Sequence, residues 1–112
     1  MPTVNIYYTK EEDYNSFQTI IVKLKEWLAK NLTCGDIALT KEEISIRFIL
    51  VKPNTMIGDF ELEVTAHSFS ERVKKQDEIC LDLIKFINNE ISSINNVKAW
   101  LNLHELGHSW ED

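Results

Sequence analysis

The chain has 112 residues, of which 44% are apolar and 27% are charged, and its formal net charge is −6. These values fit one soluble domain with its own hydrophobic core, and no apolar run approaches the roughly 18 residues that a membrane span requires. The acidic balance argues against nucleic acid as a partner, because phosphates attract basic surfaces.

The N-terminal segment and the cysteines indicate the compartment. Residues 1–8 contain no basic stretch, so they do not have the pattern of a signal peptide. Cys34 and Cys80 are too few for a disulfide framework. We therefore expect a cytoplasmic protein with free thiols and no membrane association.

The first half of the chain has the pattern of a strand, a helix and a second strand. β-Branched and aromatic residues fill positions 2–8, which predicts a strand. Thr9 and Glu12 have the spacing of a capping box, which predicts a helix that continues to about Leu32. Apolar residues recur along it at intervals of three and four, which is typical of an amphipathic helix. Residues 44–51 are predicted to form the second strand.

The second half repeats this pattern. Apolar and polar residues alternate over 60–67, as they do in a half-buried strand. Ser68 and Glu71 form a second predicted capping box, and the helix that it starts should reach about Ile91. Residues 97–103 are predicted to form a fourth strand.

The two halves correspond at a constant offset of 59 residues. The matched positions are Thr9 and Ser68, Glu12 and Glu71, Leu24 and Leu83, and Leu28 and Ile87. Any two amphipathic helices can be aligned by sliding, but here the predicted caps and the core positions agree in the same register. We therefore interpret residues 1–112 as a single domain of two pseudo-repeats, about 2–57 and 58–112.

Each repeat is a predicted β–α–β unit, and such a unit joins parallel strands through a right-handed crossover. Two units give an α+β fold with a four-stranded mixed sheet and two helices on one face. The opposite face would carry several apolar side chains. A symmetric oligomer is the simplest way to cover them.

Pro2 is the first residue whose chemistry could matter. Removal of Met1 would leave its ring nitrogen as a secondary amine, and burial or a nearby cation would favour the neutral form of that amine. A neutral amine can act as a general base. The alternative is structural, because proline is tolerated at the first position of a strand.

Four segments together resemble the tautomerase superfamily, which includes 4-oxalocrotonate tautomerase, 5-carboxymethyl-2-hydroxymuconate isomerase and macrophage migration inhibitory factor. The segments are Met1–Tyr8 (MPTVNIYY), Ile44–Val51 (ISIRFILV), Leu62–Arg72 (LEVTAHSFSER) and Trp100–Trp110 (WLNLHELGHSW). The resemblance covers nearly the whole chain in the expected order. It implies a tautomerase/MIF-like fold and a homotrimer with pockets between subunits.

The resemblance also implies a mechanism. Pro2 would move a proton on a small 2-keto or 2-hydroxy unsaturated acid, and Arg47 would bind the carboxylate of this small-molecule substrate. No cofactor and no metal are implied. Arg47 could instead form a structural ion pair between subunits. The candidate substrate-binding residues are Lys10, Tyr7, Phe48 and Trp110, and the three aromatic ones could equally be core or interface residues.

One departure from the family pattern keeps other functions open. The family's arginine in the first helix has no clean counterpart here, since Lys10 is out of register and position 12 is Glu. Arg72 could contribute a charge instead, although a residue on the first turn of a helix is more often simply solvated. A non-catalytic oligomeric binding module, on this scaffold or on a ferredoxin-like one, is therefore the alternative function.

The string His104-Glu-Leu-Gly-His108 matches the H-E-x-x-H pattern of zinc hydrolases. That chemistry requires a helix, so that both imidazoles lie on one face, and a third ligand further along the chain. Residues 97–103 are predicted to be a strand, and the chain given ends four residues after His108. A zinc hydrolase is the remote alternative.

Overall fold

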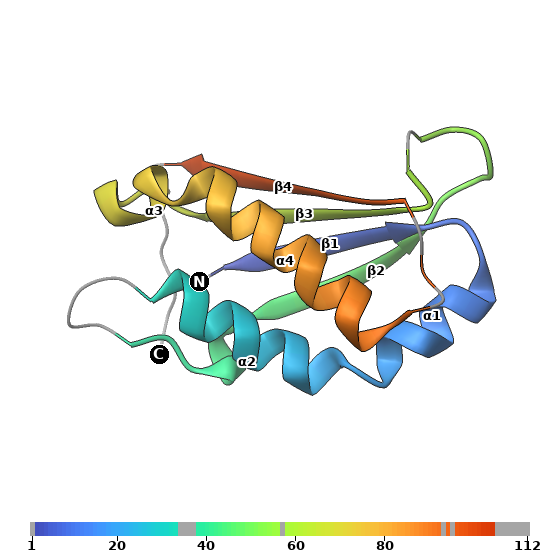
Figure 1. Ribbon diagram of the computed structural model, residues 1–112, viewed down its shortest axis with the longest axis horizontal. Coiled ribbons are helices and arrows are strands. Elements are labelled where there is room, and N and C mark those ends of the chain that lie inside the picture. The colour runs from blue at the N-terminus through green and yellow to red at the C-terminus, as the bar shows by residue number, and fades with distance from the viewer. Residues whose placement is uncertain (1, 34–37, 57, 93, 95, 105–112) are drawn as a thin grey trace, which may run out of the picture.

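The computed structural model describes residues 2–33, 38–56, 58–92, 94 and 96–104. In chain order the elements are β1 (Thr3–Tyr8), α1 (Glu11–Gln18), α2 (Ile21–Leu32), the short 3₁₀ helix η1 (Lys41–Glu43), β2 (Ser45–Leu50), β3 (Phe60–His67), α3 (Ser70–Lys74), α4 (Gln76–Glu90) and β4 (Val97–His104). The long helices α2 and α4 lie on the same face of the sheet (Figure 1).

The four strands form one mixed sheet in the order β2-β1-β3-β4. β1 is parallel to β2, with Thr3 opposite Ser45, and antiparallel to β3, with Thr3 opposite Thr65. β3 is parallel to β4. The two parallel pairs are the two β–α–β units, so the predicted α+β fold with a four-stranded mixed sheet is confirmed.

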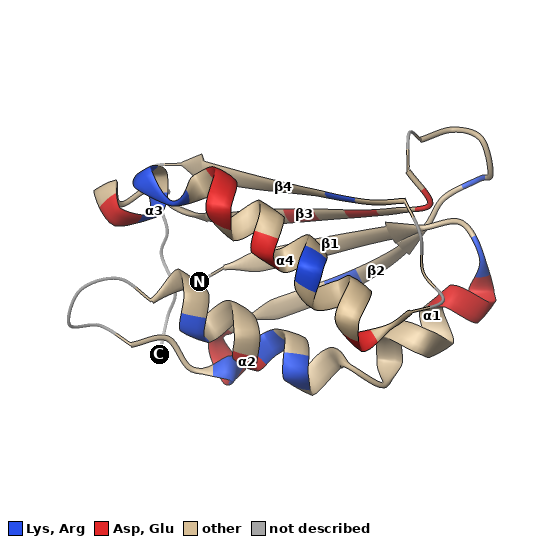
Figure 2. Ribbon diagram, in the orientation of Figure 1, with Lys and Arg blue, Asp and Glu red and all other residues tan. Residues whose placement is uncertain are grey.

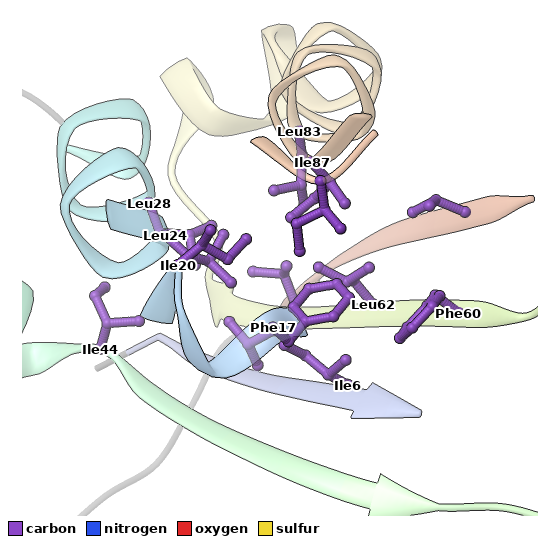
Figure 3. Close-up of a cluster of buried hydrophobic side chains, with 14 of the residues drawn as sticks. Ile6, Phe17, Ile20, Leu24, Leu28, Ile44, Phe60, Leu62, Leu83 and Ile87 are labelled. Atoms are coloured by element: carbon purple, nitrogen blue, oxygen red, sulfur yellow. The ribbon is translucent and has the colours of Figure 1, made fainter. Parts of the chain in front are cut away.

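The core lies between the sheet and the two long helices. Alternate residues of β1 and β3 are buried because successive side chains of a strand point to opposite faces. Figure 3 shows these strand residues meeting the apolar stripes of α2 and α4. Fully buried members of the cluster include Ile6, Phe17, Leu24, Leu28, Leu62, Leu83 and Ile87. Burial of each contributes about 1.5–3 kcal/mol.

Each predicted helix is two helices in the structure. The first breaks between α1 and α2 at Thr19 and Ile20, within a run of β-branched residues that lose side-chain freedom in a helix. The Thr19 hydroxyl donates a hydrogen bond of 2.7 Å to the Ser16 carbonyl. The second breaks at Lys75, and Val73, just before the break, is 51% exposed.

The predicted positions of the helix caps are wrong. The N-cap residues are Lys10 and Phe69, one residue beyond Thr9 and Ser68, and neither makes a side-chain capping hydrogen bond. Both N-cap residues have extended backbone angles, because the chain continues in the direction of the strand before it turns into the helix.

The other face of the sheet is left uncovered by the helices. Its side chains are mostly polar, and the larger apolar ones are Tyr7, Ile49 and Trp100. Within the part of the chain that the structure describes, no helix is long and apolar enough to cross a membrane.

Candidate functional site

Pro2 lies at the start of β1 and is buried. Its carbonyl accepts a hydrogen bond of 3.2 Å from the Ser45 backbone N–H, which fixes it against β2. By strand alternation Pro2 shares the helix-covered side of the sheet with Val4 and Ile6. Pro2, the candidate base, is therefore a buried residue on the helix-covered side of the sheet.

Arg72 is buried and only 5% exposed, so its expected place in solvent is wrong. Its Nε and Nη2 donate to the carbonyl of Leu32 at 3.0 and 2.7 Å, and its Nη1 donates to the carbonyl of His67 at 2.8 Å. The guanidinium carbon also lies 4.9 Å from the centre of the Phe69 ring. Arg72 thus ties the end of α2 to the end of β3.

A sequence signal for the burial of Arg72 existed. The residue precedes Ile79 by seven positions and Leu83 by eleven, so it continues the apolar stripe of the following helix.

Arg47 is exposed and lies opposite Asn5, on the sheet face that the helices leave uncovered. Pro2 lies on the other face, so the described chain does not bring these two predicted residues together. Phe48, the next residue on β2, is half-buried on the helix side. Its ring meets those of Tyr14 at 4.9 Å and Phe17 at 6.2 Å, within an aromatic cluster of the core.

Tyr7 lies on the uncovered face and belongs to a small polar network. Its hydroxyl donates to Glu63 Oε1 at 3.2 Å, and the Asn5 amide donates to the same oxygen at 3.1 Å. Burial, and then the charge of Glu63, raise the pKa of Tyr7, so its hydroxyl remains protonated at neutral pH. A hollow of about 260 Å³ opens here, lined by Tyr7, Glu61, Glu63, Trp100 and Asn102.

The remaining candidates lie elsewhere. Lys10 is exposed at the start of α1, at the far end of β1 from Pro2. The six residues of β1 span roughly 20 Å, so Lys10 cannot meet Pro2 within one chain. Trp110 lies outside the described residues.

The zinc-hydrolase interpretation is not supported by the backbone. His104 is the last residue of β4, whereas the H-E-x-x-H mechanism requires it on a helix. The rest of the motif lies outside the described residues. Among residues 2–33, 38–56, 58–92, 94 and 96–104, no group of three His, Cys, Asp or Glu side chains could hold a metal ion.

A second and larger hollow, about 530 Å³, lies between α4 and the outer edge of β4. Its lining residues are Gln76, Asp77, Cys80, Leu81, Ile84, Ala99, Trp100 and Leu101. Burial, and then the charge of Asp77, raise the pKa of the Cys80 thiol, which therefore stays protonated and unreactive at neutral pH. Gln76 donates a hydrogen bond of 2.8 Å to the Leu101 carbonyl at this edge.

Comparison with known proteins identifies the fold. No protein family and no curated protein matches the sequence. Among solved structures, a macrophage migration inhibitory factor-like protein from Entamoeba histolytica has a TM-score of 0.67 at 9% identity, with 96% of this chain and 95% of that chain covered. A fused 4-OT wild-type symmetric trimer has a TM-score of 0.53 at 14% identity, with 92% and 87% covered.

A member of the cis-3-chloroacrylic acid dehalogenase family, named N1, has a TM-score of 0.55 at 5% identity, with 92% of this chain and 75% of that chain covered. All three proteins belong to the tautomerase superfamily. At these low identities the likeness establishes the fold, and this chain has the tautomerase-superfamily fold.

Proposed function

We propose that this protein is a tautomerase or isomerase that moves a proton on a small 2-keto or 2-hydroxy unsaturated acid, with the Pro2 amine as the general base. The observation that carries the proposal is the burial of Pro2 at the start of β1, in a chain with the tautomerase-superfamily fold. Burial disfavours the protonated amine and leaves a lone pair able to accept a proton.

In the proposed reaction the amine takes the proton of an enol hydroxyl or an acidic C–H bond. It then returns the proton to a different atom of the same molecule, so no cofactor is needed. The guanidinium of Arg47 would hold the substrate carboxylate in a two-point contact and stabilise the enolate charge.

The positions of Arg47 and Tyr7 imply that the site contains more than one subunit. Both side chains lie on the uncovered face of the sheet, whereas Pro2 lies on the helix side. A neighbouring subunit would therefore supply the carboxylate-binding residues. We propose a homotrimer, and the symmetric trimer formed by the fused 4-OT protein supports this assembly. Lys10, Phe48 and Trp110 stay candidates for substrate contacts from either subunit.

The test is the ketonisation rate of the phenylpyruvate enol, measured for the unaltered protein and for Pro2→Ala after mass spectrometry has shown that Met1 is removed. General-base catalysis contributes roughly 10²–10⁴-fold, and Pro2→Ala should lose a factor of this size. Pro53→Ala is the matched control, because Pro53 is exposed beyond β2. Equal rates for the protein and Pro2→Ala would reject the proline-base mechanism.

A second candidate is a non-catalytic oligomeric binding module. The observation that favours it is the separation of Pro2 from Arg47 and Lys10 within the described chain. This alternative would be favoured by a protein that has lost Met1, still assembles as a trimer, and yet does not accelerate enol ketonisation.

A further inference from the structure

Arg72 is the one charged side chain that is buried in the part of the chain that the structure describes. All three of its hydrogen bonds go to neutral backbone carbonyls. Neither of the two salt bridges among the described residues, Lys23 with Glu90 and Lys41 with Glu26, involves Arg72. Its guanidinium is a buried positive charge, and solvent screens the field of such a charge weakly.

The direction of one peptide bond locates this charge. The Ser68 N–H donates to the His104 carbonyl on β4 at 2.8 Å. The described chain contains no cis peptide, and in a trans peptide the C=O points away from the N–H. The His67 carbonyl of the same peptide therefore points to the other side of β3, towards β1. Arg72 Nη1 meets it there at 2.8 Å.

The start of β1 lies on that side. Thr3 pairs with Thr65 in the antiparallel register, so Pro2 lies next to the stretch of β3 that ends at His67. Paired antiparallel strands are about 5 Å apart. The register places Pro2 opposite Ala66, one residue before His67, so a guanidinium bonded to the His67 carbonyl lies on the order of 10 Å from the Pro2 nitrogen.

Arg72 also offsets an opposing field. Leu32 is the last residue of α2, and its carbonyl accepts two of the three hydrogen bonds. The C-terminus of a helix carries partial negative charge, which would favour a protonated amine nearby. The guanidinium donates two hydrogen bonds to this carbonyl and so places a full positive charge at the C-terminus of the helix.

The other titratable groups around this end of the sheet are weaker influences. Lys30 of α2 and Lys41 of η1 are exposed, and Glu43 is partly exposed and bonded to Thr40. His67 itself is half-buried, and its ring packs against Phe69. Arg47 points from the opposite face. Arg72 is the charge that is both buried and directed at the start of β1.

We propose that Arg72 is a positioning residue that holds the Pro2 amine in its neutral, proton-accepting form. This inference rests on the proposed function only in that Pro2 must be the N-terminal residue. A charge about 10 Å away in a partly buried site should lower the pKa of the amine by roughly one unit.

The test is an NMR titration of the Pro2 amine in protein labelled at proline, with Met1 removal checked by mass spectrometry. Arg72→Gln keeps a hydrogen-bond donor and removes the charge, whereas Arg72→Lys keeps the charge and loses the planar fork. We expect Arg72→Gln to titrate roughly one pH unit higher than the unaltered protein, and Arg72→Lys to stay close to it. Lys30→Gln, which removes an exposed charge from α2, should leave the titration unchanged.

Several outcomes would overturn the inference. Retention of Met1 overturns it, together with the proposed base. An amine of the unaltered protein that titrates at the ordinary value, near 7.7–8.0, also overturns it, whether or not Arg72→Gln folds. Equal titration of Arg72→Gln and the unaltered protein does so as well. If the amine titrates low and Arg72→Gln raises it, but phenylpyruvate enol is not turned over, the substrate proposal fails and the inference about Arg72 is upheld.

Discussion

The two β–α–β units share a backbone plan, and among the equivalent positions where their charges differ is the one occupied by the buried Arg72. α1 begins at Glu11 and α3 at Ser70, which differ by 59 residues. The same offset relates Asp13 to Arg72. Burial, in the main, raises the pKa of Asp13, although Lys10 opposes the shift. Arg72 is buried with every hydrogen bond directed to a carbonyl.

The difference between Asp13 and Arg72 gives the two ends of the sheet opposite charges, although the two units share one fold. β1 and β3 are antiparallel, so the helices that follow them start at opposite ends of the sheet. Figure 2 shows the acidic start of α1 and the basic residues of α3 at these two ends. Pro2 lies at the end that holds Arg72. An amine beside Asp13 would instead be stabilised in its protonated form.

The largest expected effect tests how similar the two cores are. Leu28 and Ile87 are equivalent by the same offset, and both side chains are fully buried. Leu28→Ala and Ile87→Ala should each lower the free energy of unfolding by about 2–5 kcal/mol. Urea unfolding at neutral pH measures both. A loss in one variant of less than half that in the other would show that the units are not equivalent in packing.

A smaller loss of stability is expected from a change in the connection between helix and strand, which differs between the two units. In the first unit, η1 precedes β2, and the Thr40 N–H and hydroxyl both lie 3.2 Å from Glu43 Oε1. Thr40→Ala should cost about 1 kcal/mol in the same unfolding assay. Ser92→Ala, in the shorter connection of the second unit, is the control and should have little effect. Equal losses of unfolding free energy in Thr40→Ala and Ser92→Ala would mean that the contacts between Thr40 and Glu43 do not contribute to stability.

The smallest effect concerns Asp13 and depends on pH. Since its folded-state pKa is raised, its contribution to stability is present below the ordinary carboxyl value and is lost as pH rises through the raised one. Asp13→Asn should therefore be slightly more stable than the unaltered protein at pH 7, by less than about 1 kcal/mol, since the lost helix-dipole interaction offsets part of the gain. Thermal unfolding at pH 3 should show no difference. A destabilised variant at pH 7 would contradict this account.

The fold could be predicted because it depends on the spacing of apolar residues along the chain. The helix caps could not be predicted, because they depend on the backbone path that leads into each helix. Thr9–Glu12 and Thr40–Glu43 have the same sequence, TKEE. The second copy forms the contacts between Thr40 and Glu43, whereas at the first copy the helix begins one residue later and Lys10 is its N-cap. The extended exit from β1 decides the difference, and a four-residue pattern does not encode it.

The candidate site was predictable only in part. Pro2 stands out because proline at a strand start is chemically distinctive, and the structure places it, buried, at the start of β1, while its role stays a prediction. The spacing of Arg72 to Ile79 was a signal for its burial, but its partners were not predictable, because the carbonyls of Leu32 and His67 are 40 and 5 residues away and have no side-chain signature. The separation of Arg47 from Pro2 follows from strand alternation, but its relation to other subunits does not.

Gln76 has a consequence for how further strands can add to the sheet. β4 is an outer strand, and an uncovered outer strand is a template for pairing with another chain. The Gln76 amide occupies the Leu101 carbonyl near the middle of that strand. A strand from another molecule would have to share this acceptor with the Gln76 amide or displace it. Gln76 therefore makes the middle of β4 a less favourable template for strand pairing than its two ends.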